Sequence, residues 1–381
     1  MKQVYCDNGS TSFPKAPGLG KAVGRHIDSN GYNISRGGYE KAYRLETDII
    51  ETREKICRLL SCKNPKNVIF TPGATIGLNM ILKGLLHKGD HVVTTSMEHN
   101  AVVRPIVQLE KLGVSWSEAQ CDKKGILNPE CIKNLIRPET KLVLSIHGSN
   151  VSGSILPVEK IGAICREKNI FFCIDASQTA GGAEVDFDQF CADAIVFPGH
   201  KALMGPQGIG GIIISDEMAN MTETLLSGGT GSISDKETMP EFLPDKFQPG
   251  TLNIPGIIGL KHSISFIEQE GLEGIIQHKN HITDAFIENI CNMKGVELVG
   301  PGSDYERCSV VSLDFSGMDN AEAAFTLESE YGIMTRCGLH CAPHDHKTLG
   351  TFPQGTVRFS FGYFNTMEDI CYVTDSIRKI L

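Results

Sequence analysis

The stretch Ala194-Ile-Val-Phe-Pro-Gly-His-Lys201 joins a run of apolar residues to a turn that carries a histidine and a lysine. Upstream of it, a second apolar run, Ile170-Phe-Phe-Cys-Ile-Asp175, ends in a carboxylate. Short apolar runs rich in β-branched residues are typical of strands that are buried on both faces of a parallel sheet. We therefore expect two neighbouring strands, one ending in Asp175 and the other leading into Lys201.

Strand and helix patterns alternate on both sides of this pair. Strands are expected at 68–70, 91–95, 142–146 and 209–214, and helices at 45–60, 76–86, 100–112 and 158–168. This alternation predicts a mainly parallel sheet with helices on both faces. Helices at 257–270, 272–291, 321–331 and 367–381, with strands at 310–315 and 357–361, predict a second, α+β unit. Residues 1–40 are rich in Gly, Ser and Asn and are expected to form an irregular arm.

Polar side chains follow the predicted strands at their carboxyl ends. They are Thr75, Glu98 with His99, Asn150, Asp175 with Gln178, and His200 with Lys201. Ligands of parallel sheets bind at this edge. Taken alone, Lys201 could be a surface charge and Asp175 a helix cap. Together they match a pyridoxal phosphate site, in which the lysine forms a Schiff base and the aspartate keeps the pyridinium nitrogen protonated.

Composition narrows the class of protein. The chain has 381 residues, 41% of them apolar and 21% charged, which suits two or three globular domains. A net charge of −9 without a block of Lys or Arg argues against nucleic acid or an anionic membrane as a partner. No apolar stretch is long enough to span a bilayer, and the first residues lack an apolar signal core, so we expect a cytoplasmic protein.

The cysteines and histidines have several interpretations. Thirteen cysteines at irregular spacing are expected to be reduced thiols in a chain of this length. Cys341 beside His340 suggests an activated nucleophile or, alternatively, a partly buried free thiol. Cys337, Cys341 and the histidines between 340 and 346 would also admit a metal, but their order matches no common zinc pattern. We therefore expect no metal site.

Two further groups suit a phosphorylated cofactor and an amino-acid substrate. Gly73-Ala74-Thr75 precedes a predicted helix, whose free N–H groups would suit a phosphate, although Thr75 could equally be a plain cap. Arg358 on a predicted strand and Arg336 before the Cys341 loop offer guanidinium groups that match a carboxylate.

Taken in their order along the chain, the motifs resemble those of the class V aminotransferase-fold enzymes, specifically the cysteine desulfurase and selenocysteine lyase group. The resemblance runs nearly end to end through Asp7-Asn-Gly-Ser-Thr11, Gly73-Ala-Thr75, Glu98-His99, Ser149-Asn150, Asp175-Ala-Ser-Gln178, Gly199-His200-Lys201, Gly250-Thr-Leu-Asn253 and Arg358-Phe-Ser360. Each motif alone is weak, and their shared order is what makes the resemblance specific.

The resemblance implies an α/β fold, the pyridoxal phosphate-dependent transferase fold type I. Its mainly parallel seven-stranded sheet would lie between helices, beside a smaller α+β C-terminal domain. Residues 15–255 would form the large cofactor-binding domain, and residues 1–14 with 256–381 the small domain that carries the catalytic cysteine loop. A homodimer with sites at the subunit interface is implied as well.

The resemblance also assigns roles to residues. Lys201 would carry the cofactor, Asp175 would pair with the pyridine nitrogen, and His99 would stack on the ring and take part in catalysis. Gln178 and Asn150 would reach the ring oxygen, with Asn150 also near the substrate. Ala74, Thr75 and His200 would hold the phosphate together with Thr251 of the partner subunit. Arg358, Arg336 and Asn8 would bind the substrate, and Cys341 would accept sulfur.

The implied reaction converts L-cysteine to L-alanine and leaves the sulfur on Cys341 as a persulfide, for which an acceptor protein is possible. Positive charge at His340, Arg336 and His99 is expected to favour the thiolate. A selenocysteine lyase acting on L-selenocysteine, an ordinary class V aminotransferase and a non-catalytic scaffold remain alternatives. Two residues depart from the expected pattern: Pro198 stands where the family carries a phosphate-binding hydroxyl, and Cys337 adds a second thiol.

Overall fold

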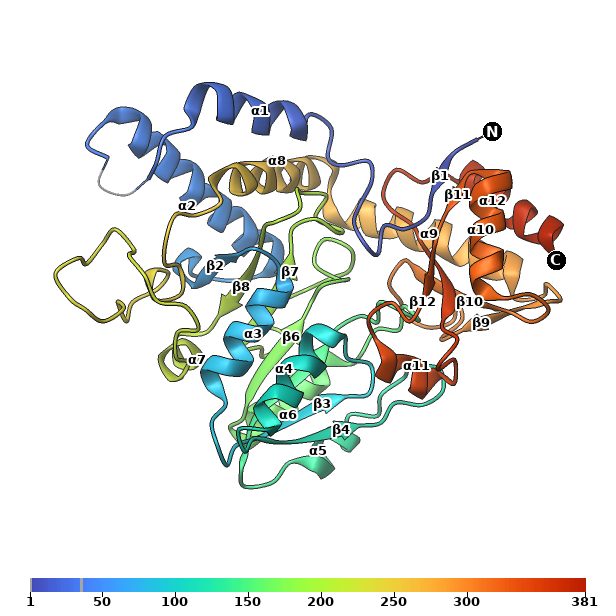
Figure 1. Cartoon of the computed structure of the whole chain (residues 1–381), viewed down its shortest axis with the longest axis horizontal. Helices are drawn as coiled ribbons and strands as arrows, with labels where there is room; N and C mark the ends of the chain where they lie inside the picture. Colours follow the sequence, from blue (N-terminus) through green and yellow to red (C-terminus); the bar gives the residue numbers. More distant parts are fainter. Residues whose placement is uncertain (1, 35–36) are drawn as a thin grey trace.

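The computed structural model describes residues 2–34 and 37–381, and its centre is a seven-stranded sheet (Figure 1). The strand order is β2-β8-β7-β6-β5-β3-β4. These strands are β2 (Val68–Thr71), β3 (His91–Thr95), β4 (Ser115–Ala119), β5 (Thr140–Ile146), β6 (Phe171–Asp175), β7 (Ala194–Pro198) and β8 (Gly210–Ile214). Neighbours from β7 to β4 are parallel, and only β8 runs against its neighbours β7 and β2. The predicted mainly parallel seven-stranded sheet is confirmed.

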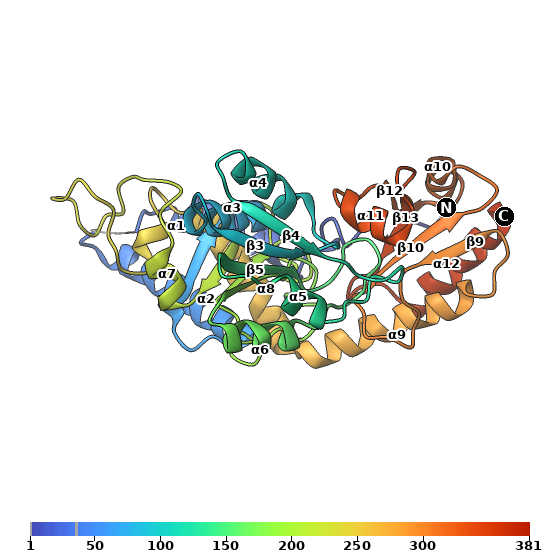
Figure 2. The ribbon, with the colours of Figure 1, turned by 90° about the horizontal axis from the view of Figure 1, so that it is seen from below.

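Both faces of this sheet are buried, which explains its uninterrupted apolar strands. In β6, Phe172 and Ile174 face a core shared with α2 (Glu40–Leu60), α6 (Val158–Lys168) and α8 (Ile254–Glu270). Phe171 and Cys173 face the opposite core, which α3 (Ala74–Leu85), α4 (Asn100–Glu110) and α7 (Asp216–Met221) complete. Figure 2 shows α3 and α4 on one side of the sheet and α6 on the other.

A second sheet has the antiparallel order β12-β13-β10-β9. Its strands are β9 (Val296–Val299), β10 (Val310–Phe315), β12 (Arg336–Gly338) and β13 (Thr356–Ser360). A third core joins it to α9 (Leu272–Ile290), α10 (Asn320–Tyr331) and α12 (Met367–Ile380). In this core the rings of Phe286 and Phe359 lie 5.2 Å apart, centroid to centroid. The short helices are α5 (Glu130–Leu135), α11 (Pro343–Leu349), and the 3₁₀ turns η1 (Pro65–Asn67) and η2 (Asp245–Phe247).

The N-terminal residues connect the two sheets. Strand β1 (Val4–Tyr5) pairs in parallel with β11 (Ile333–Met334), and Asp7 forms a bridge with Ser360 at the end of β13. Further along, the backbone N–H of Ser12 donates to the carbonyl of His200 at 3.0 Å, beside Lys201. The first residues therefore reach the carboxyl edge of the large sheet after crossing the smaller one.

Several elements were not expected from the sequence, and α1 and β4 show why. Helix α1 (Leu19–Asn30) occupies part of the segment expected to be irregular, and it packs on α8, where His262 bonds to the carbonyl of Pro17. Its glycines weaken intrinsic helix propensity, so packing rather than propensity stabilises it. Strand β4 was not predicted because it is a half-buried edge strand with polar residues. No helix among the described residues is long and apolar enough to cross a membrane.

Replacement by alanine is predicted to change stability in opposite directions at two helix glycines, because only one of them packs closely against other atoms. In Gly162→Ala the new methyl would overlap the carbonyl oxygen of Phe190 in the backbone, so we expect a loss of about 1–3 kcal/mol in the free energy of unfolding. Gly24→Ala in α1 is the matched control, because its Cβ meets no atom within 4 Å. That variant should gain about 0.5–1 kcal/mol. Urea titration of both variants checks this, and equal effects would contradict it.

Candidate active site

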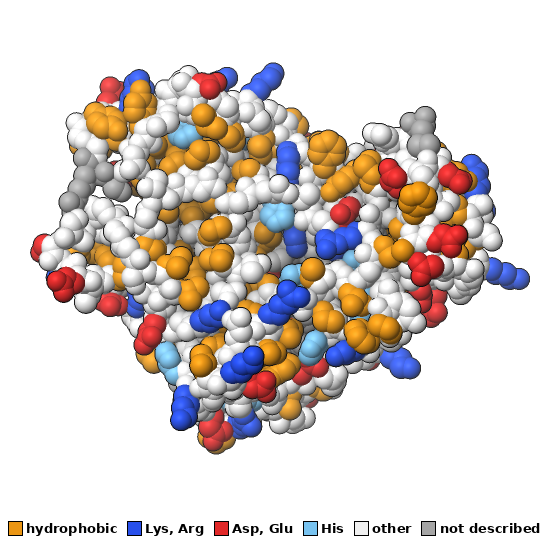
Figure 3. All heavy atoms as spheres, viewed as in Figure 1, with side chains coloured by type: hydrophobic (Ala, Val, Ile, Leu, Met, Phe, Trp, Pro, Cys, Tyr) orange, Lys and Arg blue, Asp and Glu red, His pale blue; other side chains and the backbone are white. Residues whose placement is uncertain are grey.

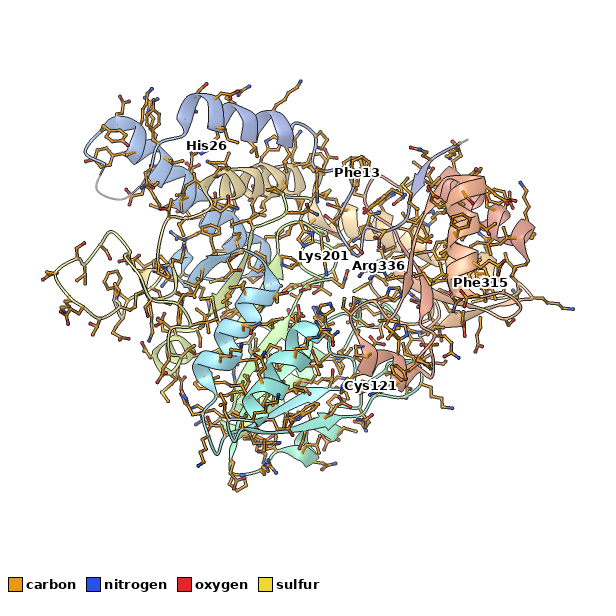
Figure 4. All side chains as sticks on the ribbon, in the orientation of Figure 1. Phe13, His26, Cys121, Lys201, Phe315 and Arg336 are labelled. Atoms are coloured by element: carbon orange, nitrogen blue, oxygen red, sulfur yellow. The ribbon has the colours of Figure 1, made fainter. Side chains whose placement is uncertain are left out.

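A cavity of about 470 Å³ lies at the carboxyl edge of the large sheet. It gathers eleven of the predicted site residues: Ala74, Thr75, His99, Asn150, Asp175, Gln178, His200, Lys201, Arg336, Cys341 and Arg358. In Figure 3 histidine and basic side chains gather in the hollow at the middle of this face. Figure 4 places Lys201 and Arg336 close together there, between the two sheets.

Two predicted residues lie elsewhere. Thr251 is exposed and lines a separate cavity of about 720 Å³, beside Asn33 and Gly229. Asn8 lines a smaller cavity beside Lys201 instead of the one of about 470 Å³, and its side-chain amide bonds to the carbonyl of Ser360 at 3.1 Å and to Asn365 at 3.3 Å. Those bonds hold the N-terminal segment, and the substrate contact of Asn8 stays a prediction.

Lys201 follows β7 through the turn at Gly199 and His200. Burial lowers the pKa of its amine to about 8, while the carboxylate of Asp175 opposes this shift. The uncharged amine, which is the nucleophilic form, is therefore far more populated at neutral pH than in an exposed lysine. The carbonyl of His200 is held by Ser12 and by the ammonium of Lys15, at 2.8 Å, which fixes the turn.

Asp175 ends β6, next to β7 in the sheet. It is buried, and burial raises the pKa of its carboxyl, against the opposing effects of the Ser177 N–H at 2.9 Å and of Lys201. A buried carboxylate of this kind is stabilised by a cationic partner. The side chain thus suits a protonated ring nitrogen.

His99 caps helix α4 with its ring. Its Nδ1 accepts the N–H of Ala101 at 3.0 Å, so the neutral ring carries its proton on Nε2. Burial and the positive charge of Lys201 lower the pKa of His99 to about 4. The preceding Glu98 accepts the N–H of Ile146 at 2.9 Å and thereby ties the end of β3 to the end of β5. His99 is therefore a fixed, uncharged ring at the edge of the cavity.

The first turn of α3 provides the anion-binding end of the cavity. Gly73, its N-cap, contributes no side-chain bond to the free N–H groups, and residues 73–76 line the cavity. Free N–H groups at a helix N-terminus bind phosphate readily. Pro198 lines the same region without a hydroxyl or an N–H. Gln207, which the sequence analysis did not single out, lines it too.

Arg358 is buried on β13 and already has several partners. Its Nη2 donates to Asp7 and to Ser10, both at 2.7 Å, and its Nη1 donates to the carbonyl of Asn150 at 3.1 Å. Its buried Nε has no partner among the described residues. Ser10 also accepts from Arg336 at 2.7 Å, so one hydroxyl aligns both guanidinium groups. The sequence offered no signal for this role of Ser10.

The Cys341 loop has an unusual backbone. Gly338, His340 and Cys341 have φ values of 107°, 48° and 60°, in the left-handed region that residues with side chains rarely adopt. Two asparagines hold the loop: the side chain of Asn150 donates to the carbonyl of His340, and the backbone N–H of Asn100 donates to that of Cys341, both at 2.8 Å. The thiol is exposed on the cavity wall.

Three side chains were expected to bring positive charge to Cys341, and only Arg336 does so. Arg336 approaches the sulfur at 3.9 Å through Nη2. Burial lowers the pKa of His340 to about 2, and that of His99 to about 4, so both rings are neutral. The expectation that the two histidines supply positive charge is therefore wrong, because burial outweighs their proximity to the thiol. Cys337 neighbours Arg336 on β12 and points to the opposite face of the strand.

The cavity fits pyridoxal phosphate. Its lining carries three cationic side chains, Lys201, Arg336 and Arg358, against the single carboxylate of Asp175. This excess of positive charge suits a phosphate together with a substrate carboxylate. Asn150 also keeps a buried Oδ1 without a partner among the described residues. No group of three or more metal-ligating side chains occurs among the described residues.

The buried carboxyl of Asp345, on α11 just after the Cys341 loop, predicts a pH effect. Burial raises the pKa of Asp345 to about 8, although Ser149 donates to it at 2.6 Å. Between about pH 4, where the unfolded carboxyl ionises, and pH 8, rising pH therefore favours unfolding. In Asp345→Asn this loss of stability with rising pH should be absent, because the amide does not ionise. The difference in Tm, variant minus wild type, should grow from pH 5 to pH 8.

Thermal unfolding across that pH range checks the prediction. Asp28→Asn, a change at an exposed position in α1, is the matched control and should show no such trend. A constant difference for Asp345→Asn would show that this carboxyl is ionised in the folded protein.

Comparisons with known proteins identify the family. A family model described as aminotransferase class V matches residues 4–373. A "probable cysteine desulfurase" of Methanothermobacter thermautotrophicus is 31% identical over 382 residues, covering 99% of this chain and 94% of the relative. Another, of Pyrococcus abyssi, is 32% identical over 374 residues, covering 96% and 91%.

Among solved structures, an apo cysteine desulfurase from Thermococcus onnurineus NA1 superposes with a TM-score of 0.92. It is 31% identical, and the match covers 99% of this chain and 94% of that one. The chain therefore belongs to the pyridoxal phosphate-dependent class V aminotransferase family, and within it to the cysteine desulfurase group.

Proposed function

We propose that this chain is a cysteine desulfurase that converts L-cysteine to L-alanine and keeps the sulfur on Cys341. The observation that carries the proposal is that the Cys341 thiol lines the same cavity as Lys201 and Asp175. A thiol is not needed to move an amino group, but it is needed to receive sulfur. The names of the relatives agree with this assignment.

Pyridoxal phosphate, when bound, supplies an electron sink that stabilises negative charge at Cα of an amino acid. Lys201 would hold it covalently, and Asp175 would keep its ring nitrogen protonated. Ala74, Thr75 and His200 would hold the phosphate. His99, which is neutral, would stack on the ring and could donate a hydrogen bond through its Nε2–H. Gln178 and Asn150 would face the ring oxygen.

The substrate is positioned by the arginines. Arg358 retains its Nε–H and one Nη1–H for a carboxylate, and Arg336 adds a second positive charge beside it. Burial lowers the pKa of the Lys201 amine to about 8. With its amine free, Lys201 would be the base that accepts the proton from Cα.

Cys341 carries out the sulfur transfer. Its thiolate attacks the substrate sulfur, so an S–S bond forms while the Cβ–S bond breaks and its electron pair returns to the carbon skeleton. Protonation at Cβ and Cα then gives L-alanine, and Cys341 is left as a persulfide. The step needs no outside oxidant, because the electron pair of the broken Cβ–S bond reduces the carbon to a methyl group while the sulfur becomes the outer atom of the persulfide. Arg336 contacts the Cys341 sulfur through Nη2 at 3.9 Å.

A homodimer with sites at the interface belongs to the proposal. The phosphate contacts within one chain are few, because Pro198 offers no hydroxyl. Thr251 is exposed and lies outside the Lys201 cavity of its own chain, which leaves it available to a neighbouring site. Thr251 of the partner subunit would complete the phosphate contacts.

The proposal also covers the division of the chain into domains, its cellular compartment and an acceptor protein for the sulfur. We divide the chain into residues 15–255 and residues 1–14 with 256–381, which agrees with the separate core around the smaller sheet. All thirteen cysteines are free thiols, which suits the reducing cytoplasm. Because Cys341 is exposed yet held in a constrained loop, sulfur delivery to an acceptor protein would require that partner to dock at the cavity.

Lys201 and Asp175 can be tested through the cofactor. After incubation with pyridoxal phosphate and borohydride reduction, peptide mass mapping should find the cofactor fixed on Lys201 in wild type and absent in Lys201→Arg. Asp175→Asn should retain the label but lose roughly 10²–10³-fold in alanine formation, the usual effect of removing one pre-organised electrostatic group. Label on Lys15 instead of Lys201 would overturn the assignment.

Cys341 decides between the proposed activities. We expect Cys341→Ala to form no alanine from cysteine above background, because no thiol remains to take the sulfur. Cys337→Ala is the matched control and should keep its activity, since that thiol points away from the cavity. Alanine is measured in parallel from cysteine and selenocysteine. If Cys341→Ala keeps full activity on selenocysteine alone, the chain is a selenocysteine lyase, and alanine formation that needs a keto acid would indicate an aminotransferase.

A further inference from the structure

A second, smaller cavity of about 30 Å³ lies beside Lys201, and a second buried lysine reaches it. Lys279, on helix α9, lines this cavity together with Lys201, Cys308 and Ser309. The Lys279 side chain is only 7% exposed. The proposed reaction assigns nothing to Lys279, Cys308 or Ser309.

Lys279 lacks the partner that a buried cation requires. Among the described residues its ammonium group makes no hydrogen bond or ion pair, and no aspartate or glutamate lines the cavity. By contrast, Lys246, which is 5% exposed, pairs with Glu241 at 3.0 Å. An unpaired buried charge costs several kcal/mol, so such a group either loses its proton or binds a counterion.

Two polar groups next to Lys279 in the cavity wall can donate a hydrogen bond. The hydroxyl of Ser309 is buried without a partner among the described residues, and burial raises the pKa of Cys308 to about 12, so it remains a protonated thiol. The neighbouring Arg307 adds positive charge, with its guanidinium bonded to backbone carbonyls rather than to a carboxylate. Burial lowers the pKa of Lys279 itself, and Cys308 offsets part of this effect.

We propose that this cavity is a binding site for a small monovalent anion, held by Lys279 with the Ser309 hydroxyl and the Cys308 thiol. The volume is roughly twice what one water requires, which admits a single-atom anion and excludes phosphate or a carboxylic acid. Halide and hydrosulfide share this charge and size. The site adjoins the larger cavity, with which it shares Gly9, Gln178 and Lys201, but Lys279, Cys308 and Ser309 line only the smaller one.

Thermal unfolding of the cofactor-loaded protein tests the site. Sodium chloride replaces sodium gluconate at constant ionic strength, because gluconate is too large for the cavity. The Tm of wild type should rise with chloride and saturate, as expected for a ligand that binds the folded state. Lys279→Met should lose this response, and Lys246→Met, the matched buried lysine with its own carboxylate, should keep it.

An equal chloride response in Lys279→Met, or none in wild type, overturns the proposal. Crystals of wild type soaked in bromide give an independent readout that requires no variant: an anomalous peak beside Nζ of Lys279 supports the site, and its absence overturns it. Repeating the unfolding series with sodium hydrosulfide identifies the source of the anion. A Lys279-dependent shift that exceeds that of chloride at equal concentration assigns the site to hydrosulfide, and a smaller one assigns it to halide.

Discussion

Parallel strands all end at one edge of their sheet, and this constraint places the site. Strands β3, β5, β6 and β7 lead into His99, Asn150, Asp175 and Lys201, and the last three of these strands are direct neighbours. Neighbouring strands are about 4.8 Å apart, so their ends deliver side chains at the spacing of a small ring and its substituents. Residues far apart in the sequence therefore meet without any long loop, and the helices need only cover the faces.

The second constraint on the site is its excess of positive charge. The cavity gathers the cations Lys201, Arg336 and Arg358, which the carboxylate of Asp175 and the N-terminal segment moderate. Asp7 pairs with Arg358, and Ser10 accepts from both arginines. The histidines contribute rings and hydrogen bonds but no charge, because burial keeps them neutral. The site is thus electropositive through lysine and arginine alone, and its affinity for anions should persist well above pH 7.

Elements were predicted correctly from the sequence where a single physical cause determines the local structure. The bounds of α6 and β10 were predicted to the residue, because apolar periodicity is strong there and packing agrees with it. Strand-end clusters identified the cavity for the same reason. Helix α1 was missed because its stability comes from packing on α8, which no local pattern encodes.

The remaining features depend on distant partners. The bonds of the Asn8 amide to Ser360 and Asn365 were not foreseen from the sequence. The neutrality of His340 depends on how deeply the loop is buried, and the role of Ser10 depends on two arginines more than 300 positions away. The position of Lys279 was not foreseen, because a helical pattern does not reveal that its side chain is buried beside a cavity.

The pairing of β1 with β11, and of Asp7 with Arg358, has a consequence for biosynthesis. The two partners in the second contact are 351 positions apart. Because the chain emerges from the ribosome with its N-terminus first, the initial residues wait unpaired until almost all of the polypeptide has been made. The central sheet can assemble during that interval, but the arginines acquire their acidic and hydroxyl neighbours only at the end. A nascent or prematurely terminated chain would therefore hold a folded sheet with an incomplete pocket, and catalytic competence would arrive with the last strand.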